Sequence, residues 1–440
     1  MVTIVYAILL VHICLCLIRP SYGAISYICI RQVLPPIARV GSLSLNTVSL
    51  VVLLCICLIN IVFCRIPNRR IYYYPVFFLT IPLALLGLMA TLPYNIQIKH
   101  LVQFTITELL PFSALCMAIV DEKDLNNVIK ALYVSFMIIG VYGILTYFIR
   151  FNPLVLLFAQ AFSFEGELYV GSGIEGESMR GVLDGGATGN MTGPLSWGQY
   201  SLIVLLFSMF PINNHYGFLK KMRIPVIFVS FINCILSIKR SVIAPAIMAF
   251  GWFIMLLVKK KRKYFAGIVA SSLVGIICLF NIPAFSSVIE SNILPSVMFW
   301  DDDYAMNHDV KGSSKEMRYD QFVYLHDKLL DSYLWGNGYG YTIEYNQKYD
   351  VSTPVKAFES IFLQVIANSG YIGLVVWLFF LIKCYNLTLG GNNKIRINAC
   401  FHSLFFLSIT LTGIQTSFWF FMLVLAILYK KKILETKIII

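Results

Sequence analysis

The sequence predicts an all-α, polytopic integral membrane protein with about 12 transmembrane helices and two large external loops. Hydrophobic residues make up 58% of the 440 residues, charged residues only 13%, and the mean hydropathy is +0.77. A soluble fold cannot cover that much apolar surface, and many of the apolar runs reach the roughly 20 residues that a membrane helix needs. Barrel strands would appear as short alternating segments, which do not dominate here.

Twelve candidate spans follow one another along the chain, separated by polar connections. The first lacks a basic region before it, so we expect a retained helix rather than a cleaved signal. Residues 19–44 fit two descriptions, an interfacial loop or a poorly formed extra helix. The predicted spans are approximately 1–18, 45–64, 71–92, 100–120, 128–150, 194–212, 223–239, 241–258, 264–283, 358–385, 397–413 and 415–430.

Positive charge is confined mainly to short clusters between apolar runs, although the net charge is +12. This is the pattern of cytoplasmic loops under the positive-inside rule, so no nucleic-acid partner is expected. Placing the clusters on one side predicts that they and both termini lie in the cytoplasm. The main clusters are 65–70, 220–223, 259–263 and 430–432.

Two long loops, 151–193 and 284–357, then lie outside and hold most of the acidic residues. The second loop is predicted to contain an amphipathic helix over 313–334, ended by Gly336. Its apolar face holds Phe322, Leu325, Leu329, Leu330 and Tyr333. With no internal repeat, the whole chain, 1–440, reads as a single membrane domain with these two elaborations.

Arg240 and its neighbour Lys239 fall at an external turn between two apolar runs. The positive-inside rule disfavours positive charge there, and charge at membrane depth is costly and tends to be functional. The alternative is a pair that extends its charged ends to the headgroups.

Arg180 and Arg318 are the arginines within the acidic loops, where Arg150 lies only at an edge. An arginine fork matches phosphate oxygens in a bidentate manner, so the external arginines could converge on a pyrophosphate. An ion pair with a nearby Asp or Glu explains each of them equally well.

Two glutamates are candidates for proton chemistry or polar contacts. Glu359 lies where the second loop re-enters the membrane, and a carboxylate there can serve as a general base. An acid favoured by a helix N-terminus is the alternative. Glu108 lies inside a predicted span, where an acid is a functional candidate or a partner for a neighbouring helix.

No cofactor or metal is expected. Neither the cysteines nor the histidines have metal-binding spacing. Asp301, Asp302 and Asp303 fit a solvated acidic loop better than a divalent-metal site. The glycines of 336–340 lack the spacing of a dinucleotide fingerprint, and no P-loop is present.

Several short motifs, in order, resemble the O-antigen ligase and polymerase superfamily. Each is loose, but their order and topological placement together make the likeness fairly specific. The motifs are Arg180-Gly181 with Gly193-Pro194, Ser237-x-Lys239-Arg240-Ser241, Trp335-Gly336-Asn337-Gly338-Tyr339-Gly340, and Glu359-Ser360 followed after nine residues by Gly370-x-x-Gly373.

The resemblance implies an all-helical, GT-C-like fold and a metal-independent, inverting glycosyl transfer. It also implies a multi-pass protein of the bacterial inner (cytoplasmic) membrane, with the active site on the periplasmic, outer face. The ligase histidine is replaced by Glu359, which favours the polymerases that join undecaprenyl-pyrophosphate-linked oligosaccharide repeats into O-antigen or capsule. In this interpretation Glu359 is the base, and Arg240 and Arg318 stabilise the leaving pyrophosphate. The candidate substrate-binding residues are Arg180, Lys239, Trp335 and Tyr339.

The implied partners are the lipid-linked glycan, as donor and acceptor, membrane lipid, a chain-length regulator and a flippase. Two other functions stay open. A lipid-linked oligosaccharide flippase also has about twelve spans, but it should show paired halves, charges within spans and short loops. The ligase itself is the third possibility.

Overall fold

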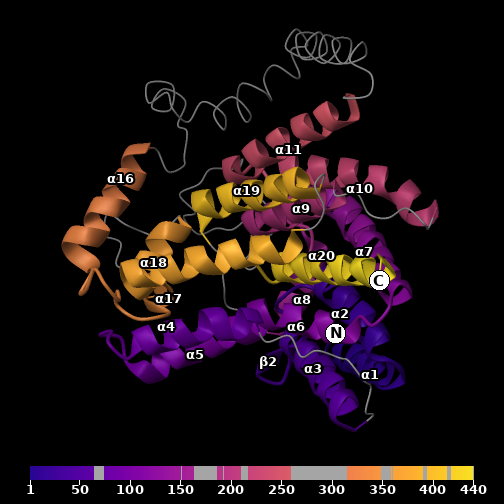
Figure 1. Cartoon of the computed structure of the whole chain (residues 1–440), viewed down its shortest axis with the longest axis horizontal. Helices are drawn as coiled ribbons and strands as arrows, with labels where there is room; N and C mark the ends of the chain where they lie inside the picture. The colour runs from indigo at the N-terminus through magenta and orange to yellow at the C-terminus, as the bar shows by residue number, and fades with distance from the viewer. Residues whose placement is uncertain are drawn as a thin grey trace.

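The computed structural model describes residues 1–63, 74–149, 151–162, 186–191, 193–209, 217–258, 315–347, 358, 360–389, 394–413 and 418–439. These residues form an assembly of packed helices with one small two-stranded hairpin (Figure 1). The elements are α1 (Val2–Ile18), α2 (Pro20–Val33), β1 (Arg39–Val40), β2 (Leu43–Ser44), α3 (Leu45–Phe63), the π-helix η1 (Val76–Thr80), α4 (Ile81–Gly87), α5 (Tyr94–Phe104), the π-helix η2 (Thr105–Leu109), α6 (Leu110–Ala118), α7 (Glu122–Ile149), α8 (Pro153–Ala161), α9 (Pro194–Ser208), α10 (Gly217–Leu236), α11 (Arg240–Val258), α16 (Lys315–Tyr324), the π-helix η4 (Leu325–Leu329), α17 (Tyr341–Gln347), α18 (Ile361–Thr388), α19 (Lys394–Thr412) and α20 (Phe418–Ile439).

Four helical stretches within the described residues are long and apolar enough to cross a membrane: Leu45–Phe63, Tyr94–Ala118, Glu122–Ile149 and Ile361–Thr388. Shorter apolar helices accompany them, among them α1 and Ala399–Thr412. The helical, membrane-embedded character is therefore confirmed. The count of twelve spans stays a prediction, because the predicted span 264–283 and much of both external loops lie outside the described residues.

Residues 19–44 contain a real helix, α2, which answers the question left open by the sequence. Pro20 occupies its first turn, where a missing N–H is tolerated. The helix is buried on most sides, and Gly23 packs so closely on α1 that a Cβ there would lie 2.4 Å from the Cys16 Sγ. With 14 residues it is about 21 Å long at the usual 1.5 Å rise, shorter than a bilayer core.

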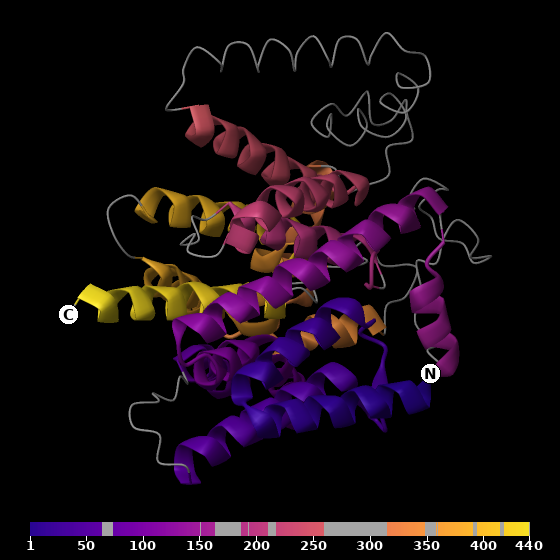
Figure 2. The ribbon, with the colours of Figure 1, turned by 90° about the vertical axis from the view of Figure 1, so that its right-hand side faces the viewer.

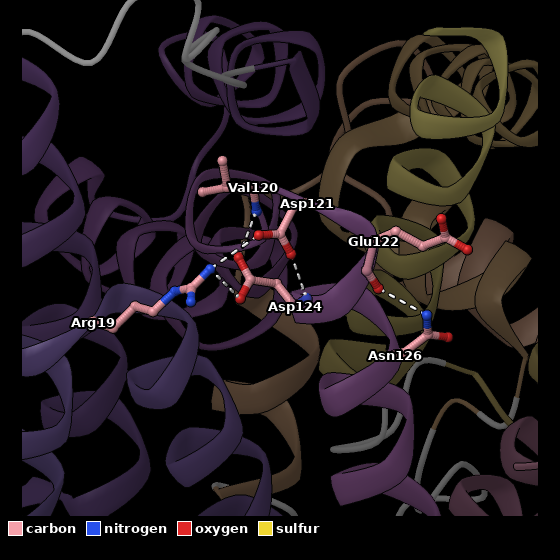
Figure 3. A network of polar contacts seen from close by, with 6 residues as sticks. All are labelled: Arg19, Val120, Asp121, Glu122, Asp124 and Asn126. Carbon is pink, nitrogen blue, oxygen red and sulfur yellow. Dashed lines mark hydrogen bonds and ion pairs between the residues drawn. The ribbon is translucent and has the colours of Figure 1, made fainter. Parts of the chain in front are cut away.

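The corner between α1 and α2 is tied to the corner between α6 and α7 (Figure 3). The Arg19 Nη2 lies 3.1 Å from Asp121 Oδ2 and 2.9 Å from Asp124 Oδ1. Asp121 Oδ1 also accepts the Asp124 N–H, and Asp124 Oδ2 accepts the Val120 N–H. These acids cap the start of α7, where the helix dipole favours negative charge.

The two chain termini lie on opposite sides of the molecule (Figure 2). At its start, α1 contributes Val5 to a buried cluster with Ile37, Leu45 and Val155, whereas its other end carries Arg19 and its ion pairs. The cytoplasmic location of both termini stays a prediction, because the position of the membrane does not follow from the helix packing alone.

The predicted helix over 313–334 is shorter and less regular than expected. It comprises α16 and the π-turn η4 and ends at Leu329, because Leu330 has extended backbone angles. Of the expected apolar face, Leu325 is buried, while Phe322 and Tyr333 are exposed. The π-turn widens the helix and rotates the residues after it off the predicted stripe.

Small residues allow close helix packing in the centre. A Cβ on Gly140 would meet Val229 of α10 at 2.7 Å, so α7 and α10 touch there. Asn233 of α10 donates to the Gly140 carbonyl at 3.0 Å and accepts the Trp197 indole N–H at 2.9 Å. Small residues combined with polar side chains between helices are the usual contacts in membrane interiors.

A break in α18 at Gly370 determines how the second loop docks. Gly370 has φ +64° and ψ −167°, a backbone region open essentially only to glycine. In a continuous helix the N–H groups of Tyr371 and Ile372 would bond to the carbonyls four residues earlier, those of Ala367 and Asn368. The break leaves both donors and both acceptors without those partners.

Segment 333–338, which includes the start of the glycine-rich turn, occupies the break and supplies new partners for all four groups. Its own glycine, Gly336 (φ +67°), approaches the backbone of α18 so closely that a Cβ would lie 2.6 Å from the Gly370 nitrogen. The four replacement hydrogen bonds are 2.9–3.1 Å long and run from the N–H groups of Asn337, Gly338, Tyr371 and Ile372 to the carbonyls of Ala367, Asn368, Tyr333 and Leu334. The two glycine motifs of the sequence are therefore two sides of one backbone contact.

Replacing Gly370 with alanine should destabilise the protein. The Ala Cβ would lie 2.3 Å from the Leu334 carbonyl oxygen, and the backbone strain alone is about 1–3 kcal/mol. We expect a lower melting temperature for the detergent-purified protein. The control is Gly251→Ala in α11, where nothing lies within 4 Å of the new Cβ. Equal melting temperatures for the two variants would contradict this account of the break.

Candidate functional site

The structure describes the predicted site residues to different extents. Arg180 and Glu359 lie outside the described residues, and for Arg240 and Arg318 the backbone alone is placed. Arg240 is the first residue of α11, and Arg318 lies within α16. The remaining three, Lys239, Trp335 and Tyr339, are described in full.

The turn before Arg240 is tight and strained. The Ser237 Oγ donates to the Cys234 carbonyl at 2.7 Å at the end of α10, and the Lys239 carbonyl accepts the N–H groups of Val242 and Ile243 in the first turn of α11. Between them, Ile238 has φ +53°. A β-branched residue rarely adopts this conformation, so the turn holds Lys239 and Arg240 in a geometry that the surrounding packing must enforce.

The end of the loop predicted over 151–193 lies directly on this turn. The Ala187 N–H donates to the Leu236 carbonyl at 2.8 Å. A Cβ on Gly186 would lie 2.4 Å from the Ser237 carbonyl oxygen. The loop that contains Arg180 and the turn that precedes Arg240 are therefore in contact through residues 186 and 187. Arg180 lies six residues before Gly186 in the sequence.

A chain of contacts leads from this turn to the start of α18. In α9, Gly198 packs on Ser237, and Gln199 next to it donates to Thr412 Oγ1 at 2.5 Å. Gln364 of α18 packs on Gly413 and donates to the Phe358 carbonyl at 2.9 Å. The Ser237–Arg240 turn and the residues around position 359 thus lie at the same end of the helix assembly.

The residues flanking position 359 also contact the helix of Arg318. Phe358 belongs to one buried cluster with Leu325 of η4, which continues α16. Ser360 caps α18, since its Oγ accepts the Phe362 N–H at 3.3 Å. Residue 359 therefore comes immediately before a helix N-cap, where a carboxylate is electrostatically favoured.

The glycine-rich turn is also fastened to α5. Gln97 donates to the carbonyls of Gly87 and Leu92 and accepts the Tyr339 N–H at 3.2 Å. The Tyr339 ring packs against Phe104, with the ring centres 6.0 Å apart. This contact gives Tyr339 a packing role, and sugar binding by Tyr339 and Trp335 stays a prediction.

Sequence reasoning missed one charged residue, Arg31. It lies in α2, is 8% exposed, and brings its Nη2 to 3.8 Å from Glu108 Oε1. The guanidinium also sits 4.4 Å above the Trp419 ring, a cation–π contact. The signal was present, because Arg31 is a lone charge in a mostly uncharged stretch, but residues 19–44 were not assigned to a helix.

Glu108 links three segments that are remote in sequence. Its Oε2 accepts the Trp419 N–H at 2.5 Å, at the first turn of α20, while Oε1 faces Arg31. A carboxylate at a helix start satisfies a free N–H and complements the dipole. Of the two explanations for Glu108, the contacts favour a bond between helices.

The described part of the site combines three features: the strained turn 237–240, the N-cap of α18 at Ser360, and the glycine-rich turn 335–340 that contacts α18. Anion binding near Lys239 and the start of α11 stays a prediction, based on the general affinity of helix N-termini for negative charge. Within the described residues, no group of three or more His, Cys, Asp and Glu side chains is placed to hold a metal ion.

The Arg31–Glu108 pair provides a test of the buried polar contact. Replacing either partner, by Arg31→Met or Glu108→Gln, should destabilise the protein by roughly 3 kcal/mol, because the other is left buried without its partner. The double variant should lose less than the sum of the single losses, as measured from melting curves in detergent.

A matched control is Lys123→Met, which removes a positive charge at an exposed position in the first turn of α7. This change should cost less than about 1 kcal/mol, as surface substitutions usually do. Strict additivity of the Arg31 and Glu108 variants would show that the two side chains do not interact.

Comparison with known proteins bears on the same region. Residues 225–378 match a family model described as O-Antigen ligase. A comparison with curated proteins found no match. The matched segment begins in α10, includes the Ser237–Arg240 turn and ends in α18 beyond the Gly370 break. These observations support the O-antigen ligase/polymerase superfamily for this membrane protein, without separating polymerase from ligase.

Proposed function

We propose that this protein polymerises oligosaccharide repeats carried on undecaprenyl pyrophosphate, at the outer face of the bacterial cytoplasmic membrane. The observation that carries the proposal is Glu359, which stands where the ligase pattern has histidine, in a segment matched to the superfamily. The match alone also fits a ligase, which is the second candidate.

The reaction joins an acceptor hydroxyl to the anomeric carbon of the donor. The new C–O bond forms as the bond to the pyrophosphate oxygen breaks, and the configuration inverts. Glu359 takes the proton of the attacking hydroxyl, and the pyrophosphate leaves with its electron pair. Arg240 and Arg318 stabilise the charge that grows on it.

The described contacts are compatible with this division of roles. Residue 359 is adjacent to Phe358 and Ser360, which lie at the same end of the assembly as the Lys239–Arg240 turn. The helix of Arg318 continues into η4, whose Leu325 packs with Phe358. A donor held between the two arginines would have its anomeric carbon near the entry to α18.

Substitution of Glu359 tests the base and separates the two candidates. In a deletion strain complemented with Glu359→Gln, we expect lipid-linked single repeats to accumulate, because loss of a general base slows transfer roughly 10²–10⁴-fold. Glu359→Asp should retain part of the activity. The measurement is the lipid-linked glycan profile, at equal protein levels in the membrane.

Two other profiles would contradict the proposal. Normal chain lengths in Glu359→Gln would remove the base assignment. In the deletion strain itself, long polymer on its lipid carrier, with none transferred to lipid A, would identify a ligase instead.

Substitutions of Arg240 and Arg318 test whether the reaction needs their charge and whether it needs the shape of the guanidinium group. Arg240→Ala and Arg318→Ala should leave single-repeat glycolipid without long chains. Arg318→Lys should also fail if the contact is bidentate, since lysine provides charge without the planar fork. Lys328→Ala, at an exposed position of η4, is the control and should give normal chains. Long chains in both alanine variants would exclude the arginines from the reaction.

A further inference from the structure

One face of α18 is exposed in the part of the helix that follows the Gly370 break. Its outward residues are Tyr371, Ile372, Val375, Leu378, Phe379 and Ile382, which repeat at helical spacing. Because Ile361–Thr388 is long and apolar enough to cross a membrane, this face is suited to contact lipid.

Aromatic rings gather where this face reaches the Gly370 break. The His326 Nε2 and the Tyr371 Oη are 2.8 Å apart, and the His326 ring centre lies 4.0 Å from that of Phe322 and 5.9 Å from that of Tyr333. Phe322, Tyr333 and Tyr371 are all exposed. Rings with an apolar body and a polar tip are enriched where membrane meets water.

Two aliphatic side chains in the loop after α4 are also exposed. Leu88 and Met89, after α4, are about as exposed as the most exposed residues of the α18 face. Their loop is joined to the segment 331–337, which contains Tyr333. The Thr91 hydroxyl donates to Asp331 at 2.5 Å, and the Leu92 N–H donates to the Asn337 carbonyl at 2.9 Å. Single exposed apolar side chains are common on protein surfaces, whereas a contiguous apolar patch that two separate segments form together usually marks a binding or membrane surface.

The orientation and polarity of α16 agree with an interfacial position. The helix lies across the end of α18 rather than along it (Figure 1). Tyr319 and Phe322 are exposed on one side, whereas Asp320 and Asp327 are exposed on another. A helix that lies in the plane of the membrane surface directs apolar residues to lipid and charged residues to water.

We propose that Phe322, His326, Tyr333, Leu334 and Tyr371, together with Leu88 and Met89, form an interfacial collar that sits in the lipid headgroup layer. A glycan platform would be the other use of exposed aromatic rings. Lipid is favoured because the collar continues the exposed apolar face of a membrane-crossing helix and includes aliphatic neighbours that cannot hydrogen-bond a sugar.

The collar does not depend on the proposed glycosyl transfer. It would nevertheless determine the depth of α16, and so hold the backbone of Arg318, four residues before Phe322, at the level of the lipid phosphates. A protein that acts on a lipid-linked pyrophosphate would gain from that position.

Photocrosslinking in defined liposomes tests the collar. Benzoylphenylalanine is introduced singly at Phe322 or Tyr333, both conservative aromatic replacements, and at Asp320 or Asp327 as matched controls on the other exposed side of the same segment. The full-length protein is reconstituted in phosphatidylethanolamine and phosphatidylglycerol without glycan, irradiated, and analysed for phospholipid adducts by mass spectrometry.

We expect several-fold more phospholipid adduct at Phe322 and Tyr333 than at the two controls. Equal or lower yields at the collar positions would overturn the proposal. Glycan adducts at these positions in cell membranes, with no phospholipid adduct in liposomes, would likewise overturn it and identify a glycan platform. Two positions are used so that one poorly folded variant does not decide the result.

Discussion

The interruption of α18 at Gly370 is the constraint on which the rest of this region depends. Backbone groups buried within a protein have no water to bond, so a helix broken there persists only if other protein groups replace its lost hydrogen bonds. Segment 333–338 does this through a direct exchange, in which each of two helical bonds is replaced by two bonds to the segment. The exchange requires glycine on both sides, at Gly336 and Gly370.

This one contact positions several functional candidates together. It fixes the turn to α18. Gln97 then fixes the same turn to α5, and the 2.8 Å contact between His100 and Glu344 fixes α17 to α5. The helix of Arg318 precedes the turn, and Ser360, the cap next to Glu359, precedes the break by ten residues. A loop attached at such a point is held by backbone geometry, and the side chains of Asn337 and Tyr339 add to its attachment.

The N-terminal region shows how a membrane protein accommodates a buried cation. Arg31 enters the interior on α2, a helix too short to span the bilayer, and meets a carboxylate and an indole ring there. An unpaired charge at this depth would be costly. Its partner Glu108 in turn holds the start of α20, so the first and last parts of the chain are connected through one polar contact.

Particular residues show where sequence reasoning succeeded and where it could not. The ends of α3 and α18 were predicted within three residues, because long apolar runs are read locally, whereas α7 begins six residues before its predicted span, in a polar stretch. The amphipathic helix 313–334 was predicted too long, because a π-turn at 325–329 depends on packing against α18 rather than on local propensity. Residues 237–240 were predicted to be a functional turn, but the left-handed Ile238 within it carries no sequence signal.

By itself, the sequence determined that this chain is a helical membrane protein with basic turns and two glycine motifs, since hydropathy and charge act over neighbouring residues. Only the tertiary structure decided that the two glycine motifs form one contact, that α2 exists, and that Arg31 pairs with Glu108. Each of these joins residues far apart in the chain, and their pairing depends on packing and backbone hydrogen bonding that no local pattern records.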